Sequence, residues 1–315
     1  MASHLSRAAG VSALTGYVPM RYNGKILAAF YAACVVPALA NIDYQGDIKG
    51  FGSEVNIRTR PHITISDHRV GDTVLPEQPE PEEIKLLIDT MKRWSFIANN
   101  EDQAQTDLKG FTKDWTEGAA EDMAVAIDTA ELAKWYAFAD SHNIGATAGA
   151  VSGAFNLGAT LAPIAITKEN ALDYISHCAT VLDEQNVPRK DGERWMTLPG
   201  WFTNCLARGD LASANEMGDS KSVRRAGQDM LGVIDGFRLF RTNLLDSVAD
   251  SGKTAFHVMF GHRSAASFAA QITENEMIPN PWGFGKLFRG MTAYGSKVVR
   301  PVSLGDLYCY KGTEA

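Results

Sequence analysis

The residues of this chain that could do chemistry do not combine into a recognised catalytic or nucleotide-binding motif. Gly252-Lys253-Thr254 has the ending of a phosphate-binding loop, but the glycine that such a loop needs five residues earlier is replaced by Ser247. The glycines between residues 145 and 158 lack the spacing that brings backbone amides against a pyrophosphate. We therefore interpret the first segment as a polar turn before a strand and the second as a mobile connection.

Histidine and cysteine give no clear indication of a metal centre or a nucleophile. The seven histidines form no HxH or HExxH pattern, and nothing forces His257 and His262 to share a metal at a predicted strand end. We expect satisfied or exposed histidines, with no cofactor and no metal. The cysteines are far apart and form no CxxC pair, which disfavours a zinc ribbon or a disulfide framework and favours a reduced, intracellular origin: Cys34, Cys178, Cys205 and Cys309.

Acidic pairs and serines have ordinary explanations as well. Glu121/Asp122 and Asp183/Glu184 lie on predicted helices whose polar faces need them, and paired acids for glycoside chemistry cannot be located without a cleft. No serine lies in a GxSxG elbow, and no cysteine has the flanking signature of a nucleophile. Arg208-Gly209-Asp210 is interpreted as a polar loop rather than an adhesion motif. The sequence therefore predicts no enzyme, with a soluble α+β enzyme of unrecognised site as the alternative.

Length and charge restrict the class of protein further. A chain of 315 residues with 45% hydrophobic composition can bury roughly 75% of its unfolded surface, enough for one large domain or two intertwined ones. The formal net charge of −7 argues against a protein whose main role is to neutralise phosphate, since nucleic-acid binding needs clustered Lys and Arg.

One strongly apolar run covers residues 26–40 and ends in Ala38-Leu39-Ala40, which resembles a signal-peptidase site. A secretory signal would place its apolar core much nearer the start of the chain. The run is also too short to span a bilayer, and Pro37 interrupts it. We interpret it as a buried amphipathic helix, preceded by 20 polar, small residues that are expected to be flexible.

The elements that would position a functional surface begin with residues 54–98, which are predicted to form one long two-stranded arm. Alternating apolar residues flank a polar, acidic tip at 67–82 that is broken by prolines, and Pro61 favours a sheet edge. A two-stranded ribbon is marginal in water by itself, so its apolar positions need another sheet or another molecule to cover them. Those positions include Val55, Ile57 and Thr59 on one strand and Ile84, Leu86 and Ile88 on the other.

Mixed α+β structure is predicted for the rest of the chain. Residues 116–139 show helical spacing of apolar positions, with Thr116 as the N-cap. The segment 145–158 is a plausible domain boundary. The second half is predicted to contain a helix capped by Thr167, strands at 194–198, 237–240 and 254–260, and helices at 201–207 and 262–273.

Together with several local motifs, this order of elements resembles the major capsid proteins of tailed bacteriophages, which have the Hong-Kong-97 fold. The resemblance covers nearly the whole chain. The chain is similar to the N-terminal segment of that group at Tyr17-Val18-Pro19 and Asn41-Ile42-Asp43-Tyr44. It is similar to the link after the extended loop at Ile97-Ala98-Asn99-Asn100. It also matches axial-domain turns at Asn186-Val187-Pro188 and Gly232-Val233-Ile234-Asp235-Gly236-Phe237.

The resemblance implies an α+β fold of four parts. These are an N-terminal arm and helix at 1–49, an extended β-hairpin loop at 50–99, a peripheral domain with a long spine helix at 100–145 and 275–315, and an axial domain at 146–274. It implies a shell-forming structural protein of the virion with no catalytic role, which is assembled in the host bacterial cytoplasm. A nanocompartment shell of the encapsulin type, which encloses protein cargo, is a close alternative.

The partners implied by the resemblance are other copies of the chain, in hexamers and pentamers. A portal, a possible decoration protein and enclosed double-stranded DNA that is bound without sequence specificity are also implied, with no membrane. A separate scaffolding protein is expected because members of the family with a fused scaffold need a far longer leader than the 44 residues here. Covalent Lys–Asn cross-links are not predicted, since residues 67–82 contain no lysine.

Contacts between subunits are predicted at the arm and at an exposed axial loop, residues 208–225. The candidates on the arm and its return strand are Val55, Ile57, Arg58, Arg60, Ile84, Leu86, Arg93 and Trp94, and those on the axial loop are Arg208, Asp210, Arg224 and Arg225.

Overall fold

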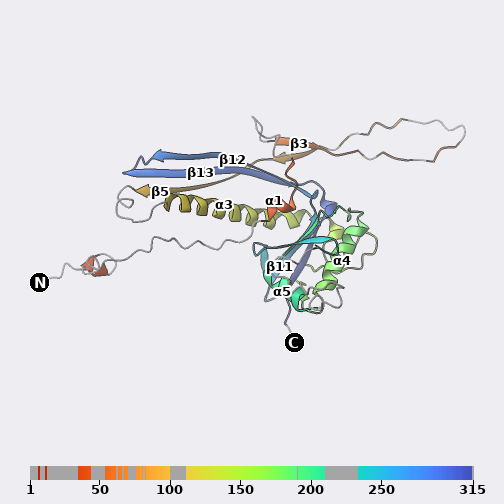
Figure 1. Cartoon of the computed structure of the whole chain (residues 1–315). Coiled ribbons are helices and arrows are strands. Elements are labelled where there is room, and N and C mark those ends of the chain that lie inside the picture. The colour runs from red at the N-terminus through yellow and green to blue at the C-terminus, as the bar shows by residue number, and fades with distance from the viewer. Residues whose placement is uncertain are drawn as a thin grey trace, which may run out of the picture.

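The structure is a computed structural model that describes residues 6–7, 11–12, 35–43, 54–61, 63–65, 67–69, 76–79, 81, 83–99, 111–189, 191–209 and 233–313. Figure 1 shows three parts, namely a long layer of helix and sheet, a two-stranded arm, and a mixed part built on a larger sheet. An α+β class is therefore confirmed.

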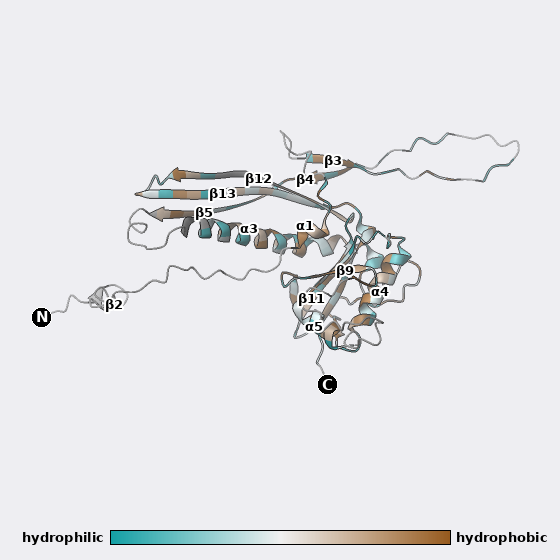
Figure 2. Ribbon diagram, viewed as in Figure 1, coloured by the Kyte–Doolittle hydropathy of each residue, from teal (hydrophilic) through white to brown (hydrophobic). Residues whose placement is uncertain are grey.

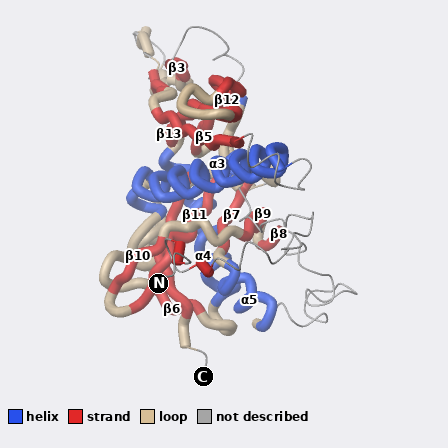
Figure 3. Tube along the Cα trace, turned by 90° about the vertical axis from the view of Figure 1, so that its left-hand side faces the viewer, coloured by secondary structure: helices blue, strands red, loops and turns tan. Residues whose placement is uncertain are grey.

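The long layer consists of one helix beneath a three-stranded antiparallel sheet. The strands β5 (Thr90–Asn99), β12 (Ala266–Pro279) and β13 (Gly285–Val298) are ordered β12-β13-β5. The helix α3 (Phe111–Trp135) continues into the 3-10 turn η4 (Tyr136–Phe138). Figure 3 shows α3 lying between this sheet and the larger one. The predicted helix at 116–139 is thus confirmed, but it begins at Phe111, so Thr116 is not its N-cap.

The arm is formed by β3 (Glu54–Arg58) and β4 (Glu83–Leu87), which pair antiparallel with Ile57 opposite Ile84. The prediction of one ribbon reaching residue 98 is wrong, because β5 pairs with β13 instead. The chain leaves β4 by crossing over β13 at Gly295, where a Cβ atom would lie 1.9 Å from the carbonyl oxygen of Leu87. Only a residue without a side chain permits this crossing.

The larger sheet has the order β6-β14-β11-β7-β9-β8, with β10 paired to β11. The predicted strands at 194–198, 237–240 and 254–260 and the helix at 201–207 are confirmed by β7, β9, β11 and α5. The predicted helix after Thr167 is α4, whose N-cap residue is Asn170. The elements of this part are η5 (Ser141–Asn143), β6 (Ile164–Ile166), α4 (Ala171–Glu184), β7 (Arg194–Leu198), α5 (Gly200–Arg208), β8 (Val233–Ile234), β9 (Phe237–Arg241), β10 (Ser247–Asp250), β11 (Lys253–His262), η7 (Pro301–Ser303) and β14 (Leu304–Lys311).

Residues 262–273 were predicted to be helical, and this is wrong: they contain the end of β11 and the first half of β12. The apolar positions 265, 268, 269 and 272 fit a helical spacing, but the beginning of β12, residues 266–269, is covered on both faces. Phe268 packs in the main core, whereas Ala269 packs against the arm. A strand that is buried on both faces loses the polar alternation that identifies a strand in the sequence.

The domain boundaries also differ from the expected ones. The boundary expected between residues 274 and 275 falls inside β12. The strand β14 pairs with β11 and β6 in the larger sheet, so residues 304–311 do not belong with the peripheral layer. Pairing across the sheet, which the sequence does not encode locally, decides this arrangement.

Near the N-terminus, the described residues form three short elements: β1 (Ser6–Arg7), β2 (Val11–Ser12) and α1 (Val36–Leu39). The predicted helix over 26–40 can be checked only at its end, where α1 lies. Its residues before Val35 and most of the predicted flexible N-terminal segment are outside the described residues. The backbone N–H groups of Val35 and Val36 donate to the carboxylate of Asp128 on α3. Burial raises the pKa of Asp128, while these two hydrogen bonds oppose the rise.

One main core connects α1, the second half of α3, the larger sheet and its helices. It contains Ile127, Leu132 and Trp135 of α3, all of which lie in the second half of that helix. A second, small cluster lies under the arm. Among the described helices, none has the length and apolar character needed to cross a membrane.

Candidate assembly surfaces

The base of the arm is held on its own protomer by the small apolar cluster. Ile57 and Leu86 are buried there against Ala269 of β12. Val55 and Ile84 are half-buried beside them. Four of the predicted contact residues therefore fix the direction of the arm, and the side chains of Ile57 and Leu86 are not available on the surface.

Beyond its base the arm presents apolar side chains to solvent. Ile63 is 62% exposed and Ile65 is 95% exposed. The side chain of Glu77 accepts hydrogen bonds from the backbone N–H and the hydroxyl of Thr64, at 3.0 and 3.2 Å, and so ties the two sides of the arm together. Figure 1 shows the arm projecting away from both sheets. An extended segment with exposed isoleucines is typical of a surface that a partner covers.

Charged residues line the arm at its base. Lys85 Nζ lies 2.8 Å from Glu54 Oε1, and this hydrogen bond and the nearby negative charge raise the pKa of Lys85. Arg58 Nε lies 3.8 Å from Glu83. Arg58 and Arg60, two of the predicted contact residues, are exposed. An ion pair this exposed contributes little to stability. Arg58 can therefore exchange Glu83 for another partner at little energetic cost.

A row of aromatic side chains lies along the end of the helix–sheet layer that is farthest from the larger sheet. Phe96 of β5 stacks on Phe288 of β13 with ring centroids 5.0 Å apart, and on Trp94 at 5.7 Å. Its edge meets Trp115 of α3 at 5.6 Å. Because Trp115 is still 48% exposed, these rings form a thin, incompletely covered layer rather than a closed core.

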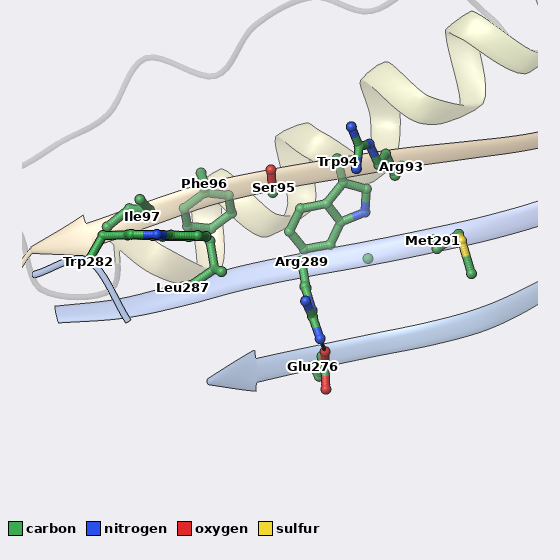
Figure 4. A pocket seen from close by; sticks show the side chains of 11 residues that line it. Arg93, Trp94, Ser95, Phe96, Ile97, Glu276, Trp282, Leu287, Arg289 and Met291 are labelled. Atoms are coloured by element: carbon green, nitrogen blue, oxygen red, sulfur yellow. Dashed lines mark hydrogen bonds and ion pairs between the residues drawn. The ribbon is translucent and has the colours of Figure 1, made fainter. Parts of the chain in front are cut away.

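A cavity of about 690 Å³ opens among these residues. Figure 4 shows Arg93 and Trp94 from β5 on one side and the Arg289–Glu276 ion pair on the other, with Trp282 at the end of the layer. Arg93 is exposed and Trp94 half-buried, so this pair of predicted contact residues lies at a surface depression.

The turn between β12 and β13 carries two exposed aromatic residues that are not among the predicted contact residues. Trp282 is 80% exposed and Phe284 is 82% exposed. Figure 2 shows hydrophobic residues at the same end of β5 and β12, where Met277 and Ile97 are also exposed. The sequence could have identified these residues, because turns are normally polar and two aromatic residues in a turn rich in Gly, Pro and Asn are unusual.

The predicted axial contact loop is only partly placed. Arg208 lies at the end of α5 and is exposed. Asp210, Arg224 and Arg225 lie outside the described residues.

The end of α3 is joined to the larger sheet by stacked and hydrogen-bonded polar side chains. The ring of Tyr136 stacks on His257 with centroids 3.8 Å apart, and His257 Nδ1 lies 2.6 Å from Asp306 Oδ2. Burial raises the pKa of Asp306, although His257 opposes this. Burial, together with a hydrogen bond from its hydroxyl to Asp250, raises the pKa of Tyr308 to about 12. Asp250, Asp306 and Tyr308 are buried at this joint, and Tyr136 and His257 are half-buried, which fits a structural role.

The motif-like segments have structural explanations. Ser251 and Gly252 form the two-residue turn of the β10–β11 hairpin, with φ of 52° and 74°, so the interpretation of Gly252-Lys253-Thr254 as a polar turn is confirmed. The segment 145–158, predicted as a mobile connection, is instead folded by backbone hydrogen bonds such as Leu157 to Gly145. Cys178, Cys205 and Cys309 are buried.

Comparison with known proteins rests on structure alone, since no protein-family model and no curated protein sequence matches the chain. A chain from Mycobacterium phage Che8 superposes with a TM-score of 0.73 at 23% identity, covering 92% of this chain and 96% of the other. The capsid structure of cyanophage P-SCSP1u gives 0.68 at 14% identity, with 96% of each chain covered. The mature capsid of bacteriophage PhiM1 gives 0.64 at 13%, covering 94% and 92%. The chain has the fold of these three phage structures, two of which are capsids, over nearly its whole length.

Proposed function

We propose that this chain is the major capsid protein of a tailed bacteriophage. In this proposal, copies of the chain assemble into hexamers and pentamers of an icosahedral shell that encloses packaged double-stranded DNA. The observation that carries the proposal is the arm, which packs on its protomer through the small cluster at its base, while Ile65, farther along the arm, is 95% exposed. The whole-chain likeness to phage capsid structures supports the same conclusion.

The mechanism is multivalent closure. Each arm lies on a neighbouring copy and adds backbone and apolar contacts there, as strand augmentation does. A millimolar contact contributes only about 4 kcal/mol, but several such contacts per subunit add up when the shell closes. Weak individual contacts let misplaced subunits leave during assembly.

The contact residues proposed for this role on the arm and the helix–sheet layer are predicted ones that the protomer leaves exposed or half-exposed. Arg58 and Arg60 belong to the arm, and Arg93 and Trp94 belong to the cavity on the helix–sheet layer. Arg208, Asp210, Arg224 and Arg225 are proposed for the axial loop. The net charge of −7 fits a protein that encloses DNA rather than one that binds its phosphates tightly.

Further partners follow from the capsid role and belong to the same proposal. They are a separate scaffolding protein, a portal and a possible decoration protein. The proposed location is the virion capsid, after assembly in the host bacterial cytoplasm, and no catalytic role is assigned to the chain.

Deletion of residues 67–82 tests the proposal. The remaining eight residues after Arg58 are long enough to close the β3–β4 hairpin, so we expect a folded, soluble chain that forms no closed shells. Electron microscopy of the protein expressed with and without a scaffolding protein measures this outcome. Normal shells from the deletion variant would contradict the proposal, and shells filled with protein instead of DNA would favour a cargo compartment.

A finer test changes only the exposed apolar residues of the arm. Replacing Ile63 and Ile65 together by Asp removes apolar area from the proposed contact without touching a buried residue. We expect an unchanged unfolding temperature and a strong loss of shell yield. The matched control is Val151→Asp, which makes the same kind of change at an 82% exposed residue of the part built on the larger sheet. Its shell yield is expected to be higher than that of the arm variant.

A further inference from the structure

Three side chains that can bind metal ions converge at one end of the larger sheet. His262 is the last residue of β11 and lies opposite Arg194, the first residue of β7, which brings Asp191 and Glu193 beside it. One ligand atom from each of the three residues lies within 4.8 Å of the other two. A single cation can therefore reach all three without a rearrangement of the backbone.

The imidazole of His262 is held in position. Its side chain is only 7% exposed, and its Nε2 atom lies 2.9 Å from Asp191 Oδ2 and 3.9 Å from Glu193 Oε2. On the other side of the ring, Nδ1 lies 2.8 Å from the hydroxyl of Ser264 and 3.1 Å from its backbone nitrogen. When Nδ1–H donates to the hydroxyl, the lone pair of Nε2 faces the two carboxylates. This outer hydrogen bond is the arrangement that orients metal-binding histidines.

Without a metal, the ring has partners in its other tautomer, since the backbone N–H of Ser264 donates to Nδ1 and Nε2–H donates to Asp191. A change of tautomer therefore replaces the hydrogen bond from the backbone N–H of Ser264 to Nδ1 by one from Nδ1–H to the Ser264 hydroxyl, and the ring keeps a partner on that side.

The carboxylates are positioned by the turn that precedes β7. Asp191 Oδ1 accepts the backbone N–H of Glu193 at 3.1 Å, which leaves Oδ2 directed at the histidine. Gly192 between them has a φ of +69°, which permits the tight turn. The side chain of Glu193 is 46% exposed, so solvent can reach the site and supply a water ligand.

We propose that Asp191, Glu193 and His262 bind a divalent cation of the Zn²⁺ class, with water as the fourth ligand. One imidazole nitrogen and two carboxylate oxygens are a suitable set for such an ion. The ion joins the segment before β7 to the end of β11. That end continues into the turn toward β12, where Arg263 N–H donates to the carbonyl of Glu193. Metal binding therefore stiffens the joint between the two sheets, a property independent of the proposed capsid role.

Titration of the EDTA-treated full-length chain with Zn²⁺ by isothermal calorimetry tests this site. We expect saturable binding of one ion per chain, and an unfolding temperature that rises with Zn²⁺. Glu193→Gln removes one ligand from an exposed position, so it should leave stability in EDTA unchanged and weaken Zn²⁺ binding by at least about tenfold. Glu169→Gln, an exposed residue elsewhere, is the matched control and should bind as the unaltered chain does.

His262→Gln gives a second readout with Co²⁺ as the probe, because loss of the nitrogen ligand changes the visible absorption of the bound cobalt. Absence of saturable Zn²⁺ binding would overturn the proposal. Equal affinity in Glu193→Gln and the unaltered chain would do so as well, since binding would then be to other groups.

Discussion

Gly295→Ala should loosen the arm without unfolding the rest of the protein. The added Cβ would lie 1.9 Å from the carbonyl oxygen of Leu87 and 2.8 Å from its carbon. Both are backbone atoms, so relief requires the whole crossing segment to move. The movement needed to reach an ordinary C···O contact is about 1.5 Å.

The energetic cost follows from what that movement opens. The segment leads directly from β4, whose Leu86 is fully buried in the small cluster under the arm. Overpacking of this kind costs about 1–3 kcal/mol. Because the cluster is separate from the main core, the cost falls on local opening of the arm. This corresponds to amide exchange about 5- to 150-fold faster in β3 and β4.

Hydrogen exchange followed by mass spectrometry measures this prediction, with peptides from β7 and β11 as internal references that should not change. Gly283→Ala is the matched control, since it makes the same substitution in the β12–β13 hairpin, where the nearest atom to the new Cβ is 3.4 Å away. If both variants exchange alike in the arm, or if Gly295→Ala loses protection uniformly, the reasoning about the crossing is refuted.

Two further predictions concern stability. Leu86→Ala should open the same cluster at a cost of about 2–3 kcal/mol, seen as faster exchange in β3 and β4 and as a lower shell yield, whereas an effect spread over the larger sheet would contradict an independent arm. Asp250 accepts hydrogen bonds from the backbone N–H of Leu161, from Ser251 and from Tyr308, and the first of these is the main reason that its pKa is held below the ordinary value of 3.8. A lowered carboxyl pKa contributes stability that is present above the ordinary pKa and is lost as the pH falls through the lowered one. The melting temperature of Asp250→Asn should therefore lie below that of the unaltered chain at neutral pH and approach it below about pH 3.8, and a constant difference down to pH 2 would contradict the assignment.

Several elements were predictable because their signals are local. The strand β7 was predicted with its observed bounds, since a turn and Pro199 delimit it. The arm was identified by alternation around an acidic, proline-rich middle, and the turn at Ser251-Gly252 by its residue types. The resemblance to phage capsid proteins also depended on local motifs in a characteristic order, and the structural comparisons agree with the fold it implied.

Other features depend on what packs against what. The sequence of β12 has helical spacing, and it is a strand because the main core and the arm cover its two faces. Burial of Ile57 and Leu86 within the protomer, rather than at a contact, depends on the approach of β12 beneath them.

By itself, the sequence determined the arm, the long helix, the absence of a recognised catalytic motif and the order of elements, because periodicity, turn residues and composition act over short distances. Only the tertiary structure decided that the return strand divides between two sheets, that β14 joins the larger sheet, and that Asp191, Glu193 and His262 meet. Strand pairing and the convergence of distant side chains depend on burial over the whole fold, which no local pattern records.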